Sequence, residues 1–292
     1  MQIKDKAAVV TGAGGGLGRG IALALARAGA DVLVVDIDAA GAEETARQIK
    51  ALGRSAAARR CDVADPQAVE AMADEAFKVF PHLALVFNNA GVVTTGLAVD
   101  TSIQNLQWTF NVNALGVWYG SMAFTRRFLA LERQGWVCNT ASENGLAAAS
   151  IGTAAYTATK HAVIGMSDAF RGEYQGRVGF SVICPGIVRT GIWDAGRNRP
   201  AEFGGKFEGN PLNQKAVGYG MGPDEAGRLV VAAVEQEAFF VFTHRHVRDV
   251  AEQRWKELAA AADAQLPEGS AQRSLSTIEI QQKVMSELQG GA

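Results

Sequence analysis

The sequence predicts an α/β protein in which a parallel, doubly wound sheet of seven strands lies between two layers of helices. Three observations point to this fold. Short apolar runs alternate with amphipathic helical segments, a glycine-rich turn follows the first apolar run, and residues 1–245 contain neither a linker of proline and serine nor a run of charges. Alternation of this kind implies right-handed crossovers and a sheet that is covered on both faces.

The amino-terminal part of the chain repeats one unit, a short apolar strand followed by an amphipathic helix. Strands are expected at Ala7–Thr11, Asp31–Asp36, Ala56–Asp62 and Leu83–Asn88. Helices are expected between them at Leu17–Ala28, Ala39–Leu52 and Pro66–Val79. Strands as short and apolar as these are typical of a sheet that is buried on both faces.

The rest of the chain continues the alternation with longer helices. The expected elements are a helical stretch near Ile103–Leu131, a strand at Trp136–Thr140, a helix at Ala155–Tyr174, and strands at Gly179–Cys184 and Ala238–Thr243. Glycine, asparagine and proline become frequent between Arg189 and Gly222, which is typical of a mobile loop. We therefore expect a single domain at residues 1–245, with a loop at about residues 190–221, and a helical extension and tail at residues 246–292.

Composition and charge argue against several classes of protein. The 28 Lys and Arg residues nearly balance the 30 Asp and Glu residues, and 48% of the chain is hydrophobic, which is unlike a disordered chain or a nucleic-acid binder. The three cysteines lie far apart and form no CxxC pair, which indicates a reducing compartment. The sequence also lacks a signal-like start and a long uncharged apolar stretch, so we expect a cytoplasmic protein that does not enter membranes.

The turn after the first strand predicts a site for a pyrophosphate. In Thr11-Gly-Ala-Gly-Gly-Gly-Leu-Gly18 the spacing is TGxxxGxG, with Gly12, Gly16 and Gly18 as its fixed points. Glycines there permit a tight turn, a close approach of the ligand and close packing of helix on sheet, and free N–H groups at the helix start face the phosphates. We expect Leu17 to contact the same ligand.

An acidic residue at the end of the second strand indicates which dinucleotide binds. Asp36 lies where this fold places a carboxylate that accepts hydrogen bonds from the adenosine ribose, and such a carboxylate would repel a 2′-phosphate. NAD is therefore expected rather than NADP. The alternative is that Asp36 caps the next helix, although Asp38 is better placed for that role. Asp62 and Val63 are expected to flank the adenine, and Asn88-Asn89-Ala90-Gly91 to line the crevice.

A tyrosine and a lysine four residues apart suggest proton transfer. Of four tyrosines, only Tyr156 has a lysine, Lys160, at this spacing, which places both on one helix face. A neighbouring ammonium and an oxidised nicotinamide both favour phenolate and lower the pKa of a tyrosine, so the pair could move a proton near neutral pH. The alternative is a half-buried tyrosine beside a solvated lysine.

The motifs together resemble the short-chain dehydrogenase/reductase family over roughly Lys4–Thr243. The resemblance is carried, in family order, by Thr11-Gly12-xxx-Gly16-x-Gly18, Asn88-Asn89-Ala90-Gly91, Asn113-Ala-Leu-Gly116, Asn139-Thr-Ala-Ser142, Tyr156-xxx-Lys160 and Pro185-Gly186-x-x-x-Thr190. No single motif is specific, but six in order are.

This resemblance implies a Rossmann fold and an NAD(P)-dependent oxidoreductase that interconverts a secondary alcohol and its ketone without a metal. It implies that Tyr156 is the general acid/base and that Lys160 lowers its pKa and holds the nicotinamide ribose. Ser142 would hydrogen-bond the substrate oxygen, and Asn113 would bend its helix and hold a water. Contacts with the nicotinamide carboxamide would come from Pro185, Gly186, Val188 and Thr190.

The assignments of Ser142 and Asn113 have competitors in the sequence, and two histidines form a possible metal motif. Ser142 lies fourteen residues before Tyr156, so Thr140 and Ser150 remain alternatives to it, and Asn111 competes with Asn113. His244-x-His246 lacks a third ligand nearby, so we interpret the two histidines as polar residues at the surface rather than as a metal site.

Two rival functions remain. A nucleotide-sugar epimerase also uses TyrxxxLys, but its glycine loop is usually GxxGxxG and its carboxyl half is longer; the Gly12-x-x-x-Gly16-x-Gly18 spacing and the roughly 50 residues after the last expected strand argue against it. A dinucleotide sensor without chemistry typically lacks the Tyr or the Lys, and both are present here.

The substrate and the assembly are predicted less directly. Ile192, Trp193, Phe203, Phe207, Pro211 and Leu212 lie in the loop after Thr190, so a bulky apolar or aromatic substrate is expected, with Trp193 contacting it, unless these aromatics only pack the loop onto the protein. The loop and tail also weakly resemble short-chain dehydrogenases that oxidise benzylic hydroxyls in lignin-derived aryl ethers. The family resemblance and the apolar helices around Asn113 and Tyr156 predict a homodimer or homotetramer.

Overall fold

The structure is a computed structural model that describes residues 1–146, 151–265 and 276–290. The chain divides into two compact units, Met1–Ala251 and Glu252–Ala292. The boundary expected at residues 245 and 246 stays a prediction.

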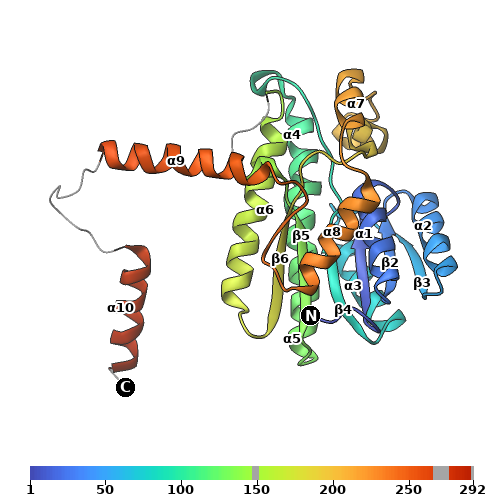
Figure 1. Ribbon diagram of the computed structural model, residues 1–292, viewed down its shortest axis with the longest axis horizontal. Coiled ribbons are helices and arrows are strands. Elements are labelled where there is room, and N and C mark those ends of the chain that lie inside the picture. Colours follow the sequence, from blue (N-terminus) through green and yellow to red (C-terminus); the bar gives the residue numbers. More distant parts are fainter. Residues whose placement is uncertain (147–150, 266–275, 291–292) are drawn as a thin grey trace. The chain divides into compact units, whose positions relative to one another are not determined.

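One parallel sheet forms the centre of the first unit (Figure 1). Its seven strands lie in the order β3-β2-β1-β4-β5-β6-β7. Their bounds are β1 Ala7–Thr11, β2 Asp31–Asp36, β3 Ala56–Arg60, β4 Leu83–Asn88, β5 Gly135–Thr140, β6 Val178–Cys184 and β7 Phe240–Phe242. All six neighbouring pairs are parallel, so the predicted doubly wound, seven-stranded Rossmann fold is confirmed.

Helices cover both faces of this sheet. One apolar core lies under α1 (Gly16–Arg27), α2 (Ala39–Ala51) and α8 (Pro223–Glu235). The other lies under α3 (Pro66–Val79), α4 (Ile103–Phe110), α5 (Gly116–Ala130) and α6 (Ala154–Glu173). Because the strand order runs outward in opposite directions from β1 and β4, the carboxyl ends of these two strands flank the crevice in which ligands of such sheets bind.

Helix α8 is the main element that the sequence reasoning missed. Pro223 occupies the first turn with Asp224 and Glu225 beside it, which is a recognisable helix start. The helix packs against α1 where two glycines meet: a Cβ on Gly227 would lie 2.2 Å from the carbonyl carbon of Gly20. No element was expected between Gly222 and the strand at Ala238–Thr243, so this helix was not predicted.

Smaller differences concern element ends and the substrate loop. The helical stretch around Asn113 is interrupted by a π-helical turn, η2 (Asn111–Leu115), between α4 and α5. The expected loop at residues 190–221 contains the short helices η4 (Gly191–Asn198), η5 (Ala201–Phe203) and α7 (Pro211–Gly218). Its two ends are joined, because the Arg189 N–H donates to the Met221 carbonyl and the Met221 N–H donates to the Ile187 carbonyl.

The remaining helices are α9 (Val247–Gln265), which begins in the first unit, and α10 (Thr277–Gly290). Within the described ranges, no helix has the length and apolar character needed to cross a bilayer.

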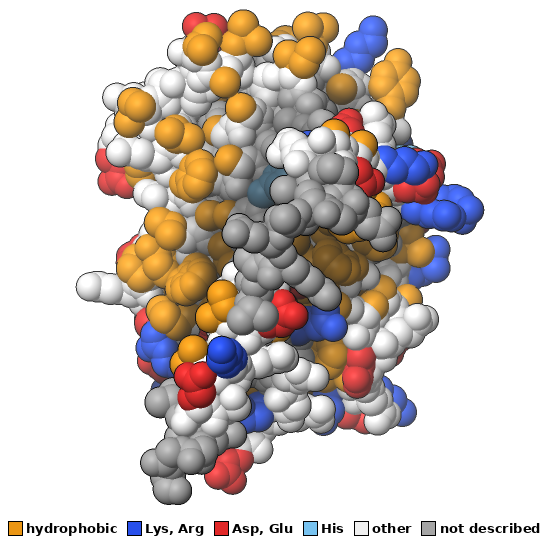
Figure 2. All heavy atoms as spheres, turned by 90° about the vertical axis from the view of Figure 1, so that its left-hand side faces the viewer, with side chains coloured by type: hydrophobic (Ala, Val, Ile, Leu, Met, Phe, Trp, Pro, Cys, Tyr) orange, Lys and Arg blue, Asp and Glu red, His pale blue; other side chains and the backbone are white. Residues whose placement is uncertain are grey.

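The apolar residues that suggested an oligomer divide into buried and exposed ones. Val112, Val117, Phe124, Val163 and Phe170 are buried within the protomer. Leu115 and Trp118 keep 42% and 43% of their surface exposed, and Ile103 and Leu106 on α4 are exposed as well. In Figure 2, hydrophobic side chains gather on the face shown. The unpaired apolar surface is therefore smaller than the sequence pattern suggested.

Candidate active site

A cavity of about 420 Å³ opens at the carboxyl ends of the strands. Its lining includes these residues that the sequence assigned to the cofactor crevice: Gly12, Gly16, Leu17, Gly18, Asp36, Asp62, Val63, Asn89, Ala90, Gly91, Tyr156, Lys160, Pro185, Gly186, Val188 and Thr190. Asn88 lies outside the lining, because its buried side chain donates hydrogen bonds to Ser121 and Asn139 instead. Ser142 and Trp193 line the same cavity. Segments from the whole first unit thus meet at one surface.

The glycine turn between β1 and α1 forms one end of the cavity. Gly12 and Gly16 have φ angles of 64° and 54°, which glycine adopts without strain. Gly18 cannot carry a side chain, since a Cβ there would lie 2.1 Å from the Gly12 carbonyl oxygen. The first turn of α1 contains no acidic residue, so its free N–H groups and positive dipole end suit a pyrophosphate.

The Asn89–Gly91 segment holds this turn in place. Both the Asn89 and the Ala90 N–H groups donate to the Thr11 hydroxyl, and the Asn89 side chain donates to the Thr11 carbonyl at 3.0 Å. Residues after β4 therefore fix the shape of the turn after β1.

The Asp36 carboxylate lies at the same end of the cavity as the glycine turn. It accepts hydrogen bonds from the Gly14 N–H at 2.8 Å and the Asp38 N–H at 2.9 Å. Asp38 is the N-cap residue of α2, the position expected for it, although its side chain makes no capping hydrogen bond. The Asp36 carboxylate binds the Asp38 backbone instead.

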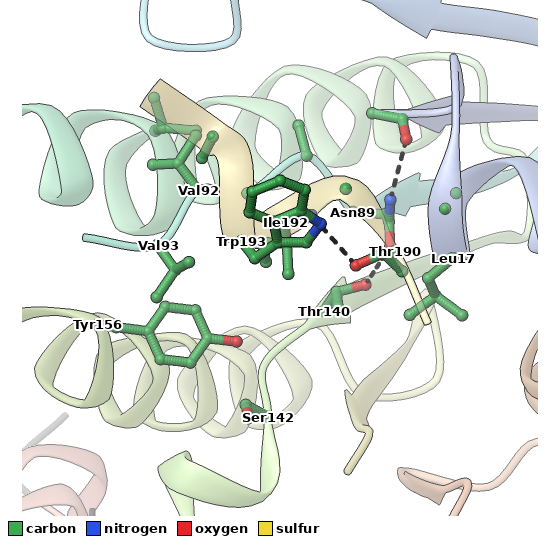
Figure 3. Close-up of a pocket in the computed structure, with 18 of the residues that line it drawn as sticks. Leu17, Asn89, Val92, Val93, Thr140, Ser142, Tyr156, Thr190, Ile192 and Trp193 are labelled. Atoms are coloured by element: carbon green, nitrogen blue, oxygen red, sulfur yellow. Dashed lines mark hydrogen bonds between the residues drawn. The ribbon is translucent and has the colours of Figure 1, made fainter. Parts of the chain in front are cut away.

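Tyr156, Lys160 and Ser142 meet at the opposite end of the cavity. In Figure 3 the Tyr156 hydroxyl points into the cavity, with Ser142 and Trp193 on opposite sides of it in this view. The Lys160 side chain is buried, with Nζ 5.4 Å from the Tyr156 ring centre, and donates to the Thr140 carbonyl at 2.8 Å. The competing Thr140 hydroxyl instead donates weakly to Asn89, and Ser150 lies outside the described residues.

The pKa of Tyr156 depends on one effect that was not expected from the sequence, the burial of its phenol. Burial raises the pKa of Tyr156, a hydrogen bond with Ser142 lowers it, and the negative charge of Glu143 raises it. Burial also lowers the pKa of Lys160 to about 8. From the sequence, only the Lys160 ammonium and the nicotinamide were expected to act on the pKa of Tyr156, and both lower it. Burial of the phenol raises this pKa, and residue spacing alone does not reveal burial.

Asn113 lies behind the cavity rather than in its lining. The π-helical turn places its buried carboxamide against the backbone of Val92: Oδ1 accepts from the Val92 N–H and Nδ2 donates to the Val92 carbonyl, both at 2.8 Å. A Cβ on Gly91 would lie 3.4 Å from the Asn113 Oδ1 and 3.7 Å from the Lys160 Nζ. Asn111, the alternative to Asn113, is also outside the cavity lining.

The loop over the cavity supplies apolar walls. Ile192, Trp193 and Phe203 line the cavity, as expected, together with Val217 on α7. Phe207, Pro211 and Leu212 do not: the Phe207 ring packs at 6.3 Å from the Trp108 ring, and Leu212 is 75% exposed. The alternative that these aromatics pack the loop onto the protein is thus correct for Phe207.

Several lining residues carried no sequence signal. They include Ile37, Val92, Val93, Thr95, Trp108, Glu143, Asn144, Asn213 and Ala216. Those next to a recognised motif, such as Val92 after Gly91 and Glu143 after Ser142, could have been found by extending the motif. Those on α7 could not, because only the fold of the loop brings them to the cavity.

His244 and His246, which follow β7, lie beside the turn at Gly186. The Gly186 N–H donates to the His244 Nδ1 at 3.2 Å, and the His246 Nε2 lies 2.6 Å from the Glu143 carboxylate. In the described part of the chain, no three His, Cys, Asp or Glu side chains are grouped as metal ligands.

Comparisons with known proteins agree with this geometry. A family model described as short chain dehydrogenase matches residues 6–200. The chain is 28% identical over 281 residues to the C alpha-dehydrogenase of Sphingobium sp. (strain NBRC 103272 / SYK-6), covering 92% of this chain and 91% of that protein. It is 30% identical over 251 residues to 1-deoxy-11-beta-hydroxypentalenate dehydrogenase of Streptomyces exfoliatus, covering 85% of this chain and 86% of that protein.

A solved structure extends the comparison to the fold. A short-chain dehydrogenase/reductase from Burkholderia phymatum, crystallised in complex with NAD, matches with a TM-score of 0.85 and 30% identity, covering 94% of this chain and 100% of that one. Together with the glycine turn, the Tyr156–Lys160 pair and the seven-stranded sheet, these matches show that the chain belongs to the short-chain dehydrogenase family of oxidoreductases, which bind a nicotinamide dinucleotide.

Proposed function

We propose that this protein is an NAD-dependent dehydrogenase that interconverts a bulky, largely apolar or aromatic secondary alcohol and its ketone. The observation that carries the proposal is the single cavity that has the Gly12–Gly18 turn and Asp36 at one end and Ser142, Tyr156 and Lys160 at the other. A dinucleotide fits such a lining, because a glycine cradle, a carboxylate and a proton donor follow one another along it.

Each polar side chain at the catalytic end has a distinct task. When bound, the nicotinamide ring supplies the acceptor for the hydride in alcohol oxidation. Tyr156 takes the hydroxyl proton of the alcohol, and Ser142 donates a hydrogen bond to the substrate oxygen. The Lys160 ammonium, held by the Thr140 carbonyl, favours the phenolate form of Tyr156 and binds the nicotinamide ribose. Asn113 keeps the Val92 backbone in place beside them.

The direct test is an oxidation assay followed at the absorbance of reduced nicotinamide. A panel of alcohols is offered with NAD and, in parallel, with NADP. Formation of reduced NAD with at least one secondary alcohol is the expected result. Binding of NAD without turnover of any panel member would favour the dinucleotide sensor instead, and turnover that needs a nucleotide sugar would favour the epimerase.

Cofactor preference depends on Asp36. We expect the parent to prefer NAD, and Asp36→Ala to reduce the NAD/NADP ratio of kcat/KM by about tenfold, because removing a like charge from the 2′-phosphate site relieves on the order of 1 kcal/mol or more. Asp38→Ala is the matched control, since its side chain is outside the cavity lining. A parent enzyme that uses NADP better would contradict the ribose assignment of Asp36.

Substrate size depends on Trp193. The parent should oxidise an aryl or polycyclic secondary alcohol more efficiently than a small aliphatic one, and Trp193→Ala should lower this ratio of kcat/KM by roughly tenfold through lost apolar contact. Leu212→Ala, in the same loop but 75% exposed and outside the lining, is the control. If the small alcohol is preferred by the parent, or if the ratio is the same in Trp193→Ala, the loop does not select for bulk.

We also propose a homodimer or homotetramer. The support is the exposed apolar surface of Ile103, Leu106, Leu115 and Trp118 on α4, η2 and α5. Light scattering after gel filtration at micromolar concentration should give at least twice the mass of the chain. A monomeric mass would contradict this assembly.

A further inference from the structure

One carboxylate close to the proposed proton donor has no part in the chemistry described so far. Glu143 directly follows Ser142, begins the short 3-10 turn η3 (Glu143–Gly145) and lines the cavity. Its N–H donates to the Pro185 carbonyl at 3.0 Å. Glu143 therefore joins the segment after β5, which contains Ser142, to the turn after β6.

The Glu143 side chain is held from a third direction. Its carboxylate lies 2.6 Å from the His246 Nε2, with 20% of the Glu143 side chain and 54% of the His246 side chain exposed. On the same loop, the His244 Nδ1 accepts from the Gly186 N–H. The loop after β7 is thus fastened to both turns that border the catalytic end of the cavity.

The charged and titratable groups around the Tyr156 hydroxyl come from several elements. Lys160 lies on the same helix, Glu143 follows β5, and Arg197 lines the cavity from η4. Cys184 ends β6 and is coupled to Lys160, while His244 and His246 follow β7. The other two carboxylates in the described lining lie at the proposed adenosine end, where Asp36 ends β2 and Asp62 follows β3. Glu143 accordingly contributes the negative charge at the catalytic end.

We propose that Glu143 and His246 are a positioning pair for proton transfer at Tyr156, acting through the negative charge that they hold in the cavity wall. The inference rests on the proposed function of Tyr156. His246 fixes the carboxylate and draws off part of its charge, either as a cation or as a neutral N–H donor. Neither side chain needs to touch the substrate.

The direction of the effect follows from electrostatics. The Glu143 carboxylate disfavours the phenolate and so raises the pKa of Tyr156. Without this charge the phenolate forms at lower pH. In the oxidation direction, kcat/KM increases with pH as Tyr156 loses its proton, so the position of this increase reports the charge around the hydroxyl.

The experiment measures the pH dependence of kcat/KM for NAD-linked alcohol oxidation. Glu143→Gln should move the increase to lower pH by roughly half a unit to one unit. His246→Ala should move it to higher pH, because the Glu143 carboxylate then has no N–H donor at this position and keeps its full charge. In the double variant the His246 substitution should have no further effect. Glu173→Gln, which removes a carboxylate from the far end of α6, should leave the profile unchanged.

Each result has a defined meaning. An unmoved pH profile in Glu143→Gln would overturn the pair, and so would a shift that His246→Ala causes equally in the parent and in the Glu143→Gln background. If Glu143→Gln fails to fold, as judged by circular dichroism, His246→Ala alone decides, since the His246 side chain is 54% exposed. If kcat/KM of Tyr156→Phe still increases with pH as in the parent, the proposed function of Tyr156 is wrong. That outcome differs from an unmoved pH profile in Glu143→Gln, which would contradict only the role of the Glu143–His246 pair.

Discussion

Replacing Tyr156 with phenylalanine is expected to reduce kcat/KM for alcohol oxidation by about a hundredfold to ten-thousandfold, while NAD still binds. The change removes the one hydroxyl that can accept the substrate proton and keeps the ring, so the cavity retains its shape. Steady-state rates together with titration of bound NAD by fluorescence would separate the two effects.

The matched control for this change is Tyr174→Phe. Tyr174 follows the last residue of α6, and its ring packs 5.9 Å from the Phe170 ring, a contact that phenylalanine preserves. Near-parental activity is expected for this variant. Appreciable residual turnover of Tyr156→Phe at high pH would contradict the general-base role of Tyr156.

Replacing Gly18 with alanine is expected to lower the free energy of unfolding by about 3 kcal/mol and to weaken NAD binding severely. The added Cβ would lie 2.1 Å from the Gly12 carbonyl oxygen and 2.6 Å from the Asn89 Nδ2. The first neighbour is backbone, so α1 must move away from the turn, and overpacking of this kind costs roughly 1–3 kcal/mol or more. Thermal unfolding should show a decrease in Tm of about 10 °C.

Gly15→Ala is the control within the same turn. Gly15 has a φ of −168°, which any residue adopts, and a Cβ there would meet no atom within 4 Å. Its Tm should stay close to that of the parent. A similar loss of stability in both variants would mean that the turn needs flexibility at every glycine rather than a close approach at Gly18.

The sequence was most informative where one residue type was required by local geometry. The period of the apolar residues predicted all seven strands, because a strand buried on both faces admits few alternatives. Gly12, Gly16 and Gly18 were recognisable because a tight turn and a close approach leave no room for a side chain. Motifs at the ends of successive strands could be assigned to one edge, since parallel strands bring their carboxyl ends together.

Features that depend on distant contacts could not be predicted in this way. The start of helix α8 could have been recognised from its first turn. Its position on the sheet could not, because it depends on the contact between Gly20 of α1 and Gly227. Phe207 and Trp193 look alike in the sequence of the substrate loop, yet one packs on Trp108 and the other lines the cavity. Which aromatic faces the substrate depends on how the loop folds.

The amino-acid sequence by itself determined the sheet, because short apolar strands that alternate with helices follow the rules of parallel sheets. It also indicated the family, through six ordered motifs that resemble it, and most of the residues that line the cavity, because parallel strands bring their carboxyl ends to one edge. Only the tertiary structure decided the electrostatic setting of Tyr156. Burial, the hydrogen bond with Ser142 and the charge of Glu143 act on its pKa together, and His246, 103 residues further along the chain, holds that charge in place. Such effects depend on distance and solvent access, which the order of residues does not contain.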